Sequence, residues 1–302
     1  MFKINKLKNN SIFGVIIFNM KMERILVAID FSGDSINALE HAIFMANGMK
    51  AHLRLLYVSK SNKIELPFHL QEESFQNLNS SEDYFKLIFE KYGNKYLVKD
   101  GVFDYKVRKG KVYSEITNLA KEDNCFIILM GTHGVSGFEE YMLGSTAFRV
   151  VTKANCPVLT IRNGFSSGLI PRIVLPLDIT NHTRQKVPLI TDIALAFNSE
   201  VHVLGVRETD SKEVIERVNQ YVDQVYDNLI SKEIKAIKAH VKGNNITNIT
   251  IDYAKEVNAD LIGTMTDQTE SPENIWLGPY AQQMVNHSPI PVLSIHPTRN
   301  YS

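Results

Sequence analysis

An internal repeat constrains the fold of this chain more than any other feature of its sequence. Five short landmarks occur in the first half and again, in the same order, in the second half. Such agreement indicates two copies of one folding unit. The length of 302 residues also suits two domains of about 150 residues each. The matched pairs are Arg24–Asp30 with Arg172–Asp178, Ala51–Val58 with Glu200–Val206, Tyr105–Gly110 with Ile234–Gly243, Ile128–Thr132 with Asp260–Thr264, and Asn155–Ile161 with Ser288–Ile295.

Within the first copy, short apolar runs alternate with segments of helical spacing. Strands are predicted at 24–30, 51–58, 103–109, 126–130 and 156–161, and helices at 36–50, 82–96, 113–122 and 145–151. The alternation predicts an α/β fold with two tandem, doubly wound, parallel five-stranded sheets that carry helices on both faces. The interval from Asp30 to Gly110 is 80 residues, whereas that from Asp178 to Gly243 is 65. The first copy therefore carries an insertion, which we place at 59–81.

Composition excludes several classes of protein. Lysine plus arginine and aspartate plus glutamate number 33 each, so the formal charge of zero gives no electrostatic argument for binding nucleic acid or an anionic membrane. No stretch has the length of a membrane span. The two cysteines, Cys125 and Cys156, lie in apolar, strand-like surroundings. We therefore expect buried reduced thiols and a cytoplasmic location.

The first 22 residues are set apart as an N-terminal extension. A basic segment precedes the apolar run 11–18, which superficially resembles a signal peptide. No small-residue cleavage site follows, and a strand begins almost at once. We favour a poorly ordered or accessory extension, with translation from Met20 or Met22, or export of the protein, as the alternatives.

The stretch 131–146 has the pattern of a phosphate-binding loop. It follows an apolar strand, has glycines at 131, 134, 137 and 144, and leads through Ser145 and Thr146 into a helical segment. Glycine lets the backbone approach a phosphate closely, and a helix N-terminus offers unpaired N–H groups with a partial positive charge. The alternative is a strand-to-loop turn in which the glycines serve the backbone alone.

With these residues in view, the sequence resembles the universal stress protein family in its tandem two-domain form. The resemblance covers residues 23 to about 297. Nucleotide-binding members carry Gly-x2-Gly-x9-Gly-Ser/Thr, and Gly131, Gly134, Gly144 and Ser145 match it without a gap. The resemblance implies a Rossmann-like, adenine nucleotide alpha hydrolase-like fold that binds ATP, with Mg²⁺ left open. It also implies that the last strands of the two domains meet, which here are 156–161 and 291–295.

The resemblance assigns a role to each residue of the implied ATP site. Asp30 would lie near the ribose or a phosphate-bound metal. Met130 and Gly131 would flank the ribose and phosphates. The adenine pocket would be formed by Ala28, Ile29 and the backbone of Val58, and the phosphates would be held by Gly134, Gly144, Ser145 and Thr146. Most of these positions fall at the carboxyl ends of parallel strands, where such sheets bind ligands.

Several of these residues have structural interpretations as well. Asp30 could instead cap the following turn, and Arg149 could face either solvent or a phosphate. His133 has no partner in the sequence for a metal site or a nucleophile pair, so we expect a solvated loop residue. Tyr141 and Met142 are expected to pack against the domain.

The second copy departs from the motif. Thr266 stands where the second glycine is expected, and the spacing to Gly278 is two residues longer. Pro279 replaces the serine and so removes a hydroxyl and an N–H donor. Acidic residues at 267, 270 and 273 add negative charge. We therefore expect this copy to be a covalently attached, pseudo-dimeric partner that binds no nucleotide.

These observations lead to one principal functional hypothesis and two alternatives. We expect a non-catalytic, ATP-binding stress-response or signalling protein with domains at 23–162 and 171–297 and a linker at 163–170. The first alternative is a slow ATPase or phosphotransfer enzyme, although the glycine motif contains no lysine and no base is clearly placed. The second is a partner-binding module with vestigial sites, using the insert 59–81 and the acidic loop 267–273. Further homodimerisation and the identity of a protein partner stay open.

Overall fold

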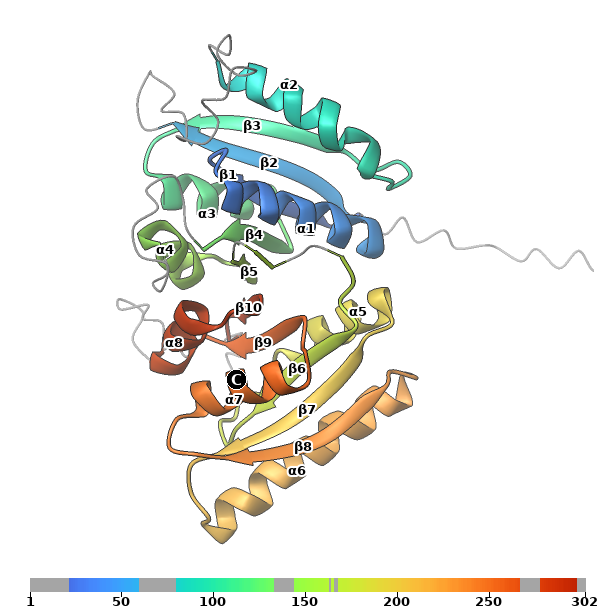
Figure 1. Cartoon of the computed structure of the whole chain (residues 1–302), viewed down its shortest axis with the longest axis vertical. Helices are drawn as coiled ribbons and strands as arrows, with labels where there is room; N and C mark the ends of the chain where they lie inside the picture. Colours follow the sequence, from blue (N-terminus) through green and yellow to red (C-terminus); the bar gives the residue numbers. More distant parts are fainter. Residues whose placement is uncertain are drawn as a thin grey trace, which may run out of the picture.

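The computed structural model describes residues 22–59, 80–132, 144–162, 164–165, 168–266 and 278–297. Strands and helices alternate through both halves of the chain (Figure 1). The first half contains β1 (Arg24–Ile29), α1 (Gly33–Met49), β2 (His52–Ser59), α2 (Ser81–Tyr92), β3 (Phe103–Lys109), α3 (Val112–Glu122), β4 (Ile127–Gly131), α4 (Ser145–Lys153) and β5 (Val158–Ile161). The second half contains β6 (Arg172–Leu177), α5 (Val187–Phe197), β7 (Glu200–Arg207), α6 (Lys212–Ser231), β8 (Ala236–Lys242), α7 (Ile246–Glu256), β9 (Leu261–Met265), α8 (Pro279–His287) and β10 (Val292–Ile295).

The two predicted sheets are halves of one continuous sheet. Its strand order across the described residues is β3-β2-β1-β4-β5-β10-β9-β6-β7-β8. Pairing within each half is parallel, whereas β5 and β10 pair antiparallel, with Leu159 opposite Leu293. The predicted meeting of the last strands of the two domains is confirmed. The antiparallel pair relates the two halves by an approximate two-fold axis (Figure 1).

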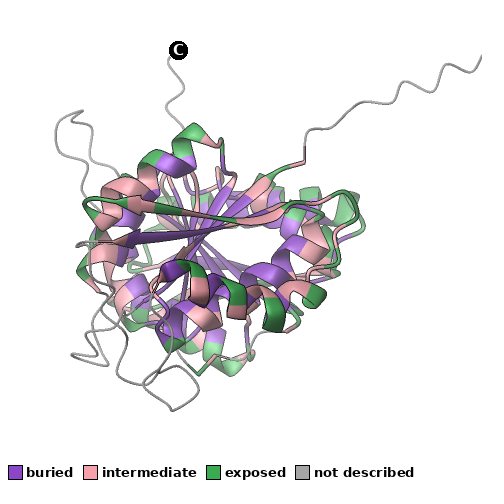
Figure 2. Cartoon of the chain, turned by 90° about the horizontal axis from the view of Figure 1, so that it is seen from above, coloured by how far each residue is buried: buried purple, intermediate pink, exposed green. Residues whose placement is uncertain are grey.

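Helices cover both faces of the sheet and enclose two apolar cores. Helices α1, α2, α5 and α6 contribute to the core on one face, and α3, α4, α7 and α8 to the core on the other. Seen from above, buried strands run through the middle while the helices turn their exposed sides outward (Figure 2). The central strands are buried on both faces, which explains why they appear in the sequence as continuous apolar runs.

Local sequence explains where several elements begin and end. Ser32 caps α1 by accepting a hydrogen bond from the Ser35 N–H, and Ser80 and Asp83 form a capping box at α2. The helix predicted to reach residue 96 ends at Tyr92, where Gly93 begins a 3₁₀ turn. The strand predicted from residue 156 begins at Val158, after Pro157, which has no N–H for the ladder.

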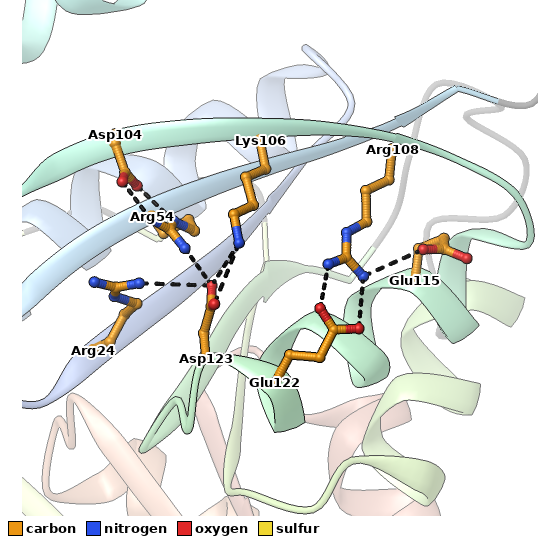
Figure 3. A network of polar contacts seen from close by, with 8 residues as sticks. All are labelled: Arg24, Arg54, Asp104, Lys106, Arg108, Glu115, Glu122 and Asp123. Atoms are coloured by element: carbon orange, nitrogen blue, oxygen red, sulfur yellow. Dashed lines mark hydrogen bonds and ion pairs between the residues drawn. The ribbon is translucent and has the colours of Figure 1, made fainter.

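A charged network fastens the edge of the first half (Figure 3). Arg54 on β2 is largely buried and hydrogen bonds to Asp104 on β3 and to Asp123 just after α3. Lys106 Nζ lies 3.3 Å from Asp123 Oδ1. Arg108 pairs with both Glu122 and Glu115 of α3. Buried ions require such pairing, because a lone charge loses its hydration without compensation. The network therefore holds β3 and α3 against β2.

The two cysteines are free. Cys125 is buried and Cys156 is partly buried, and both lie just before a strand rather than within one. Burial raises the pKa of each thiol to about 12. Both are therefore protonated at neutral pH, which disfavours thiolate chemistry. No helix in the described part of the chain is long and apolar enough to cross a membrane.

Candidate functional site

The predicted pocket residues gather where β1, β2 and β4 end. Strand β1 lies between β2 and β4, so the carboxyl ends of all three meet at one edge of the sheet. The side chains of Ala28, Val58 and Met130 pack in the same core, beneath α3 and α4. Ile29 packs in the core on the opposite face. Its side chain is therefore kept away from the other three, and only its backbone is at the shared edge.

Asp30 follows β1 directly and is held by the next turn. Its Oδ1 accepts hydrogen bonds from the N–H and hydroxyl of Ser32, and its own N–H donates to Ser35 Oγ at 3.3 Å. The turn-capping role left open by the sequence is thus present. The second half repeats it with Asp178, Thr180 and Thr183. Because it recurs in both copies, this arrangement is a feature of the fold. A contact between Asp30 and a ligand would have to be made in addition to these turn-capping hydrogen bonds.

Phe31, in the same turn, anchors it by packing its ring into the core. Its φ of 63° lies in the left-handed region, which is strained for a bulky residue. The ring is buried and lies 4.9 Å, centroid to centroid, from both Tyr57 and Tyr84. Aromatic packing thus offsets the backbone strain. No role was predicted for this residue from the sequence. Its position between Asp30 and Ser32, in the turn that follows β1, was the only indication that it could matter for the site.

Gly131 ends β4 and lies against the start of α1. A Cβ at this position would lie 2.7 Å from Asp34 Cβ and 2.9 Å from the Asp34 carbonyl carbon. Only glycine permits this contact between strand and helix. The backbone of α1 already occupies this side of Gly131. Packing of β4 against α1 is therefore the observed reason for glycine at this position, and its phosphate-binding role stays a prediction.

The backbone closes the base of the glycine loop. The Gly144 N–H donates to the Thr132 carbonyl at 2.8 Å, and the Thr132 N–H donates to the Ile161 carbonyl at 3.1 Å. The two ends of the loop are thereby clamped to each other and to β5. Thr132 was missed by sequence reasoning because its contribution is made by its backbone, which leaves no signal in residue type.

Helix α4 begins at this clamp, and its N-cap residue makes no side-chain capping hydrogen bond. Gly144 is the N-cap residue and has no side chain to accept from the first N–H groups. Ser145 is exposed and Thr146 is partly exposed. Unpaired N–H groups and the helix dipole favour an anion at such a position. Arg149 is exposed, and its guanidinium carbon lies 5.2 Å from the centroid of the Tyr113 ring.

Other predicted positions lie outside the described residues. They include the second motif glycine, Gly134, together with His133, Tyr141 and Met142. Most of the predicted insert (60–79), the acidic positions at 267, 270 and 273, and residues 1–21 also lie outside. Among the described residues, no three side chains of the metal-binding types are grouped together.

The equivalent place in the second half is arranged differently. Thr266 is buried, and its Oγ1 lies 2.6 Å from His296 Nδ1. Helix α8 begins with Pro279 after the N-cap residue Gly278, so its first helical residue has no N–H. His296 is partly buried, and the loss of hydration there disfavours the imidazolium and lowers its pKa to about 4. This end of the second half therefore offers fewer donors to an anion than α4 does.

Comparison with known proteins relates both halves of the chain to one family. The model of the universal stress protein family matches residues 21–162 and 170–296. Universal stress protein YxiE of Bacillus subtilis (strain 168) is 32% identical over 148 residues, which cover 46% of this chain and 98% of that protein. Universal stress protein MJ0531 of Methanocaldococcus jannaschii is 31% identical over 146 residues, covering 46% and 82%. A universal stress protein structure from Archaeoglobus fulgidus DSM 4304 covers 91% of this chain and 98% of its own, with a TM-score of 0.70 and 19% identity, and so shares the fold.

Proposed function

The chain belongs to the universal stress protein family, and from that premise we propose that its first domain binds ATP or another adenine nucleotide. The base would lie against Ala28 and Val58, with Asp30 and Met130 toward the ribose. The triphosphate would lie at Gly131 and at the start of α4. We place the two domains at 23–162 and 171–297, and the protein in the cytoplasm, where its two free thiols would remain reduced.

One observation carries the proposal. The clamp between Thr132 and Gly144 joins the end of β4 to the N-terminus of α4, whose N-cap glycine has no capping side chain. Strand β4 pairs with β1, which contains Ala28 and is followed directly by Asp30. Donors for phosphate and an apolar surface for a base are thereby adjacent. The motif Gly-x2-Gly-x9-Gly-Ser, from Gly131 to Ser145, supports the same assignment.

We further propose that nucleotide binding is restricted to the first domain and involves no chemistry. Pro279 removes one donor from α8, and Thr266 Oγ1 is engaged with His296. A nucleotide bound to one half would act by changing the surface that the protein presents to a partner. We assign no general base, because the carboxylate of Asp30 at this edge accepts hydrogen bonds from Ser32 in its own turn.

The number of nucleotides per chain tests the proposal. We expect mass spectrometry and calorimetry to find one adenine nucleotide per chain. Ser145→Pro copies the second domain and should abolish binding without unfolding α4, because proline is tolerated in the first turn of a helix. The matched control, Pro279→Ser, should leave the count at one. Two nucleotides per wild-type chain, or none, would contradict the proposal.

A further inference from the structure

Two basic residues lie over one aromatic ring beside the proposed nucleotide site, and a third immediately precedes the helix that carries the ring. Tyr113 lies in the first turn of α3, and α3 packs alongside α4 (Figure 1). The Arg149 guanidinium carbon is 5.2 Å from the centroid of the Tyr113 ring, and Lys153 Nζ is 5.6 Å from it. Lys111 immediately precedes the same helix. Lys111, Arg149 and Lys153 are called the α3–α4 basic cluster below.

The cluster continues the proposed phosphate site along one side of α4. Ser145, Arg149 and Lys153 are spaced four residues apart, and all three are exposed. Positions so spaced lie on one side of a helix, and eight residues extend about 12 Å. The cations therefore begin one turn beyond the N-terminus of α4, where the triphosphate is proposed to lie.

Neither carboxylate of α3 pairs with the α3–α4 basic cluster. Glu115 and Glu122 both pair with Arg108 on β3 (Figure 3). Within the described residues, no carboxylate forms an ion pair with Lys111, Arg149 or Lys153, and the last two instead lie over the Tyr113 ring. Among the described residues, the cluster therefore has three exposed cations without a carboxylate partner.

Lys111 occupies a position that is unfavourable for a cation. It is the N-cap residue of α3, and its side chain makes no capping hydrogen bond. The N-terminus of a helix carries a partial positive charge, so a cation there is repelled and an anion is attracted. Asparagine, aspartate and serine are the usual residues at this position because they accept a hydrogen bond from the first turn. A bound anion would offset both the missing cap and the repulsion.

The second domain provides an internal comparison. Helices α3 and α7 have the same length, as do α4 and α8, so their positions match one to one. Asn245 stands at the position of Lys111 and caps α7 through the Asn248 N–H. Gln283 stands at the position of Arg149 and accepts a hydrogen bond from Asn245 Nδ2 at 2.9 Å. The half that lacks the phosphate motif therefore has a conventional cap and an amide pair where the first half has the cluster.

We propose that the α3–α4 basic cluster is a second phosphate subsite, which holds a phosphate group beyond those bound at the N-terminus of α4. The inference rests on the proposed nucleotide site and extends its ligand class to nucleotides with a phosphate chain longer than a triphosphate. The additional phosphate supplies the anion at the start of α3. Arg149 reaches it from above the Tyr113 ring, which holds the guanidinium in place.

Calorimetric titration with three probes tests the subsite: ATP, adenosine 5′-tetraphosphate and inorganic tripolyphosphate. The test variant combines Lys111→Asn, Arg149→Gln and Lys153→Gln, of which the first two copy the second domain. Lys121→Asn is the matched control, because it removes one charge from the exposed far end of α3. All substituted side chains are exposed, and thermal unfolding will verify that each variant is folded.

We expect wild type and Lys121→Asn to bind the tetraphosphate about tenfold more tightly than ATP, with the gain falling as salt screens the charges. The triple variant should bind both nucleotides equally, within about twofold. Equal affinities in wild type, or a gain that persists in the triple variant, would overturn the subsite.

Failure of the nucleotide site would give a different pattern. If wild type binds neither nucleotide, the proposed function is wrong, and tripolyphosphate then decides the subsite. Binding of tripolyphosphate by wild type and its loss in the triple variant would support an anion site that serves free polyphosphate. Absence of that binding as well would overturn the subsite.

Discussion

Gly131 illustrates how a single residue sets the spacing between two elements. The missing side chain allows α1 to lie directly on the end of β4, with Asp34 Cβ at 2.7 Å and the Asp34 carbonyl carbon at 2.9 Å from the place a Cβ would occupy. Backbone atoms cannot rotate away as a flexible side chain can. Any larger residue must therefore displace the start of α1, and with it the turn that orients Asp30.

We expect Gly131→Ala to destabilise the protein by about 1–3 kcal/mol, because it overpacks a rigid contact. The free energy of unfolding, measured by urea denaturation, checks this value. Gly93→Ala is the control, because Gly93 has a helical φ of −57° and no atom lies within 4 Å of the place its Cβ would take. It should change stability by less than about 0.5 kcal/mol. An equal effect of both substitutions would contradict the packing argument.

At the scale of elements, the charged network around Arg54 joins a helix to two strands (Figure 3). Asp123, at the end of α3, accepts from Arg54 on β2 and lies 3.3 Å from Lys106 on β3. Burial by itself raises the pKa of Asp123, but the hydrogen bonds and charges of Arg54 and Lys106 outweigh it, and the pKa is lowered. The folded protein therefore favours the carboxylate more than the unfolded chain does.

We expect Asp123→Asn to cost about 2–4 kcal/mol at pH 7, since it leaves Arg54 partly uncompensated in a buried position. A carboxyl whose pKa is lowered by folding stabilises the protein above its unfolded pKa and loses that contribution as the pH falls through its folded value. The difference between wild type and variant should therefore shrink below about pH 4. Urea denaturation from pH 7 to pH 3 measures it. A difference independent of pH would exclude the electrostatic explanation.

At the scale of the whole molecule, the two halves are joined by more than the central strand pair. Arg162, just after β5, donates through Nη2 to the Asn286 carbonyl on α8. His296, just after β10, lies beside the backbone of Val151 on α4 and contacts Thr266. On the other face, the rings of Phe44 on α1 and Phe197 on α5 stack at 4.8 Å. Each half thus holds the last helix of the other.

His296 should make the joined structure sensitive to mild acid. Burial lowers its pKa to about 4, whereas an exposed histidine in the unfolded chain titrates near 6.5. The unfolded state therefore binds more protons between these values, and stability falls as the pH drops through that window. We expect a loss of up to about 3 kcal/mol between pH 7 and pH 4. His296→Gln should flatten this part of the profile, and an unchanged profile would show that another group is responsible.

The central strand pair should decide the assembly state of an isolated half. Strand β5 is buried on both faces and pairs on one edge with β10. Residues 22–162 alone would expose that edge, and unpaired apolar edges associate. We expect this fragment to dimerise through β5, as measured by analytical ultracentrifugation. Thr160→Pro should weaken the dimer, because Thr160 faces Val292 in the pair and proline cannot donate to the ladder. A monomeric, cooperatively folded fragment would contradict the expectation.

The sequence by itself determined the repeat, the α/β class and most strand positions. Apolar runs and helical spacing depend only on residues close together in the sequence, and the order of the landmarks can be read along the chain without knowing the fold. The glycines and hydroxyls of 131–146 also marked one candidate site and its altered copy. The period-two alternation along β1 could further have separated Ile29 from Ala28 and Asp30, since neighbouring strand residues point to opposite faces.

Only the tertiary structure decided features that depend on atoms far apart in the chain. The merging of two sheets into one required β5 and β10, which are more than a hundred residues apart, to meet edge to edge. The packing role of Gly131 became visible once α1 lay against β4. The α3–α4 basic cluster likewise needed two helices side by side, because the chemistry of Lys111, Arg149 and Lys153 depends on their shared surface and not on their order.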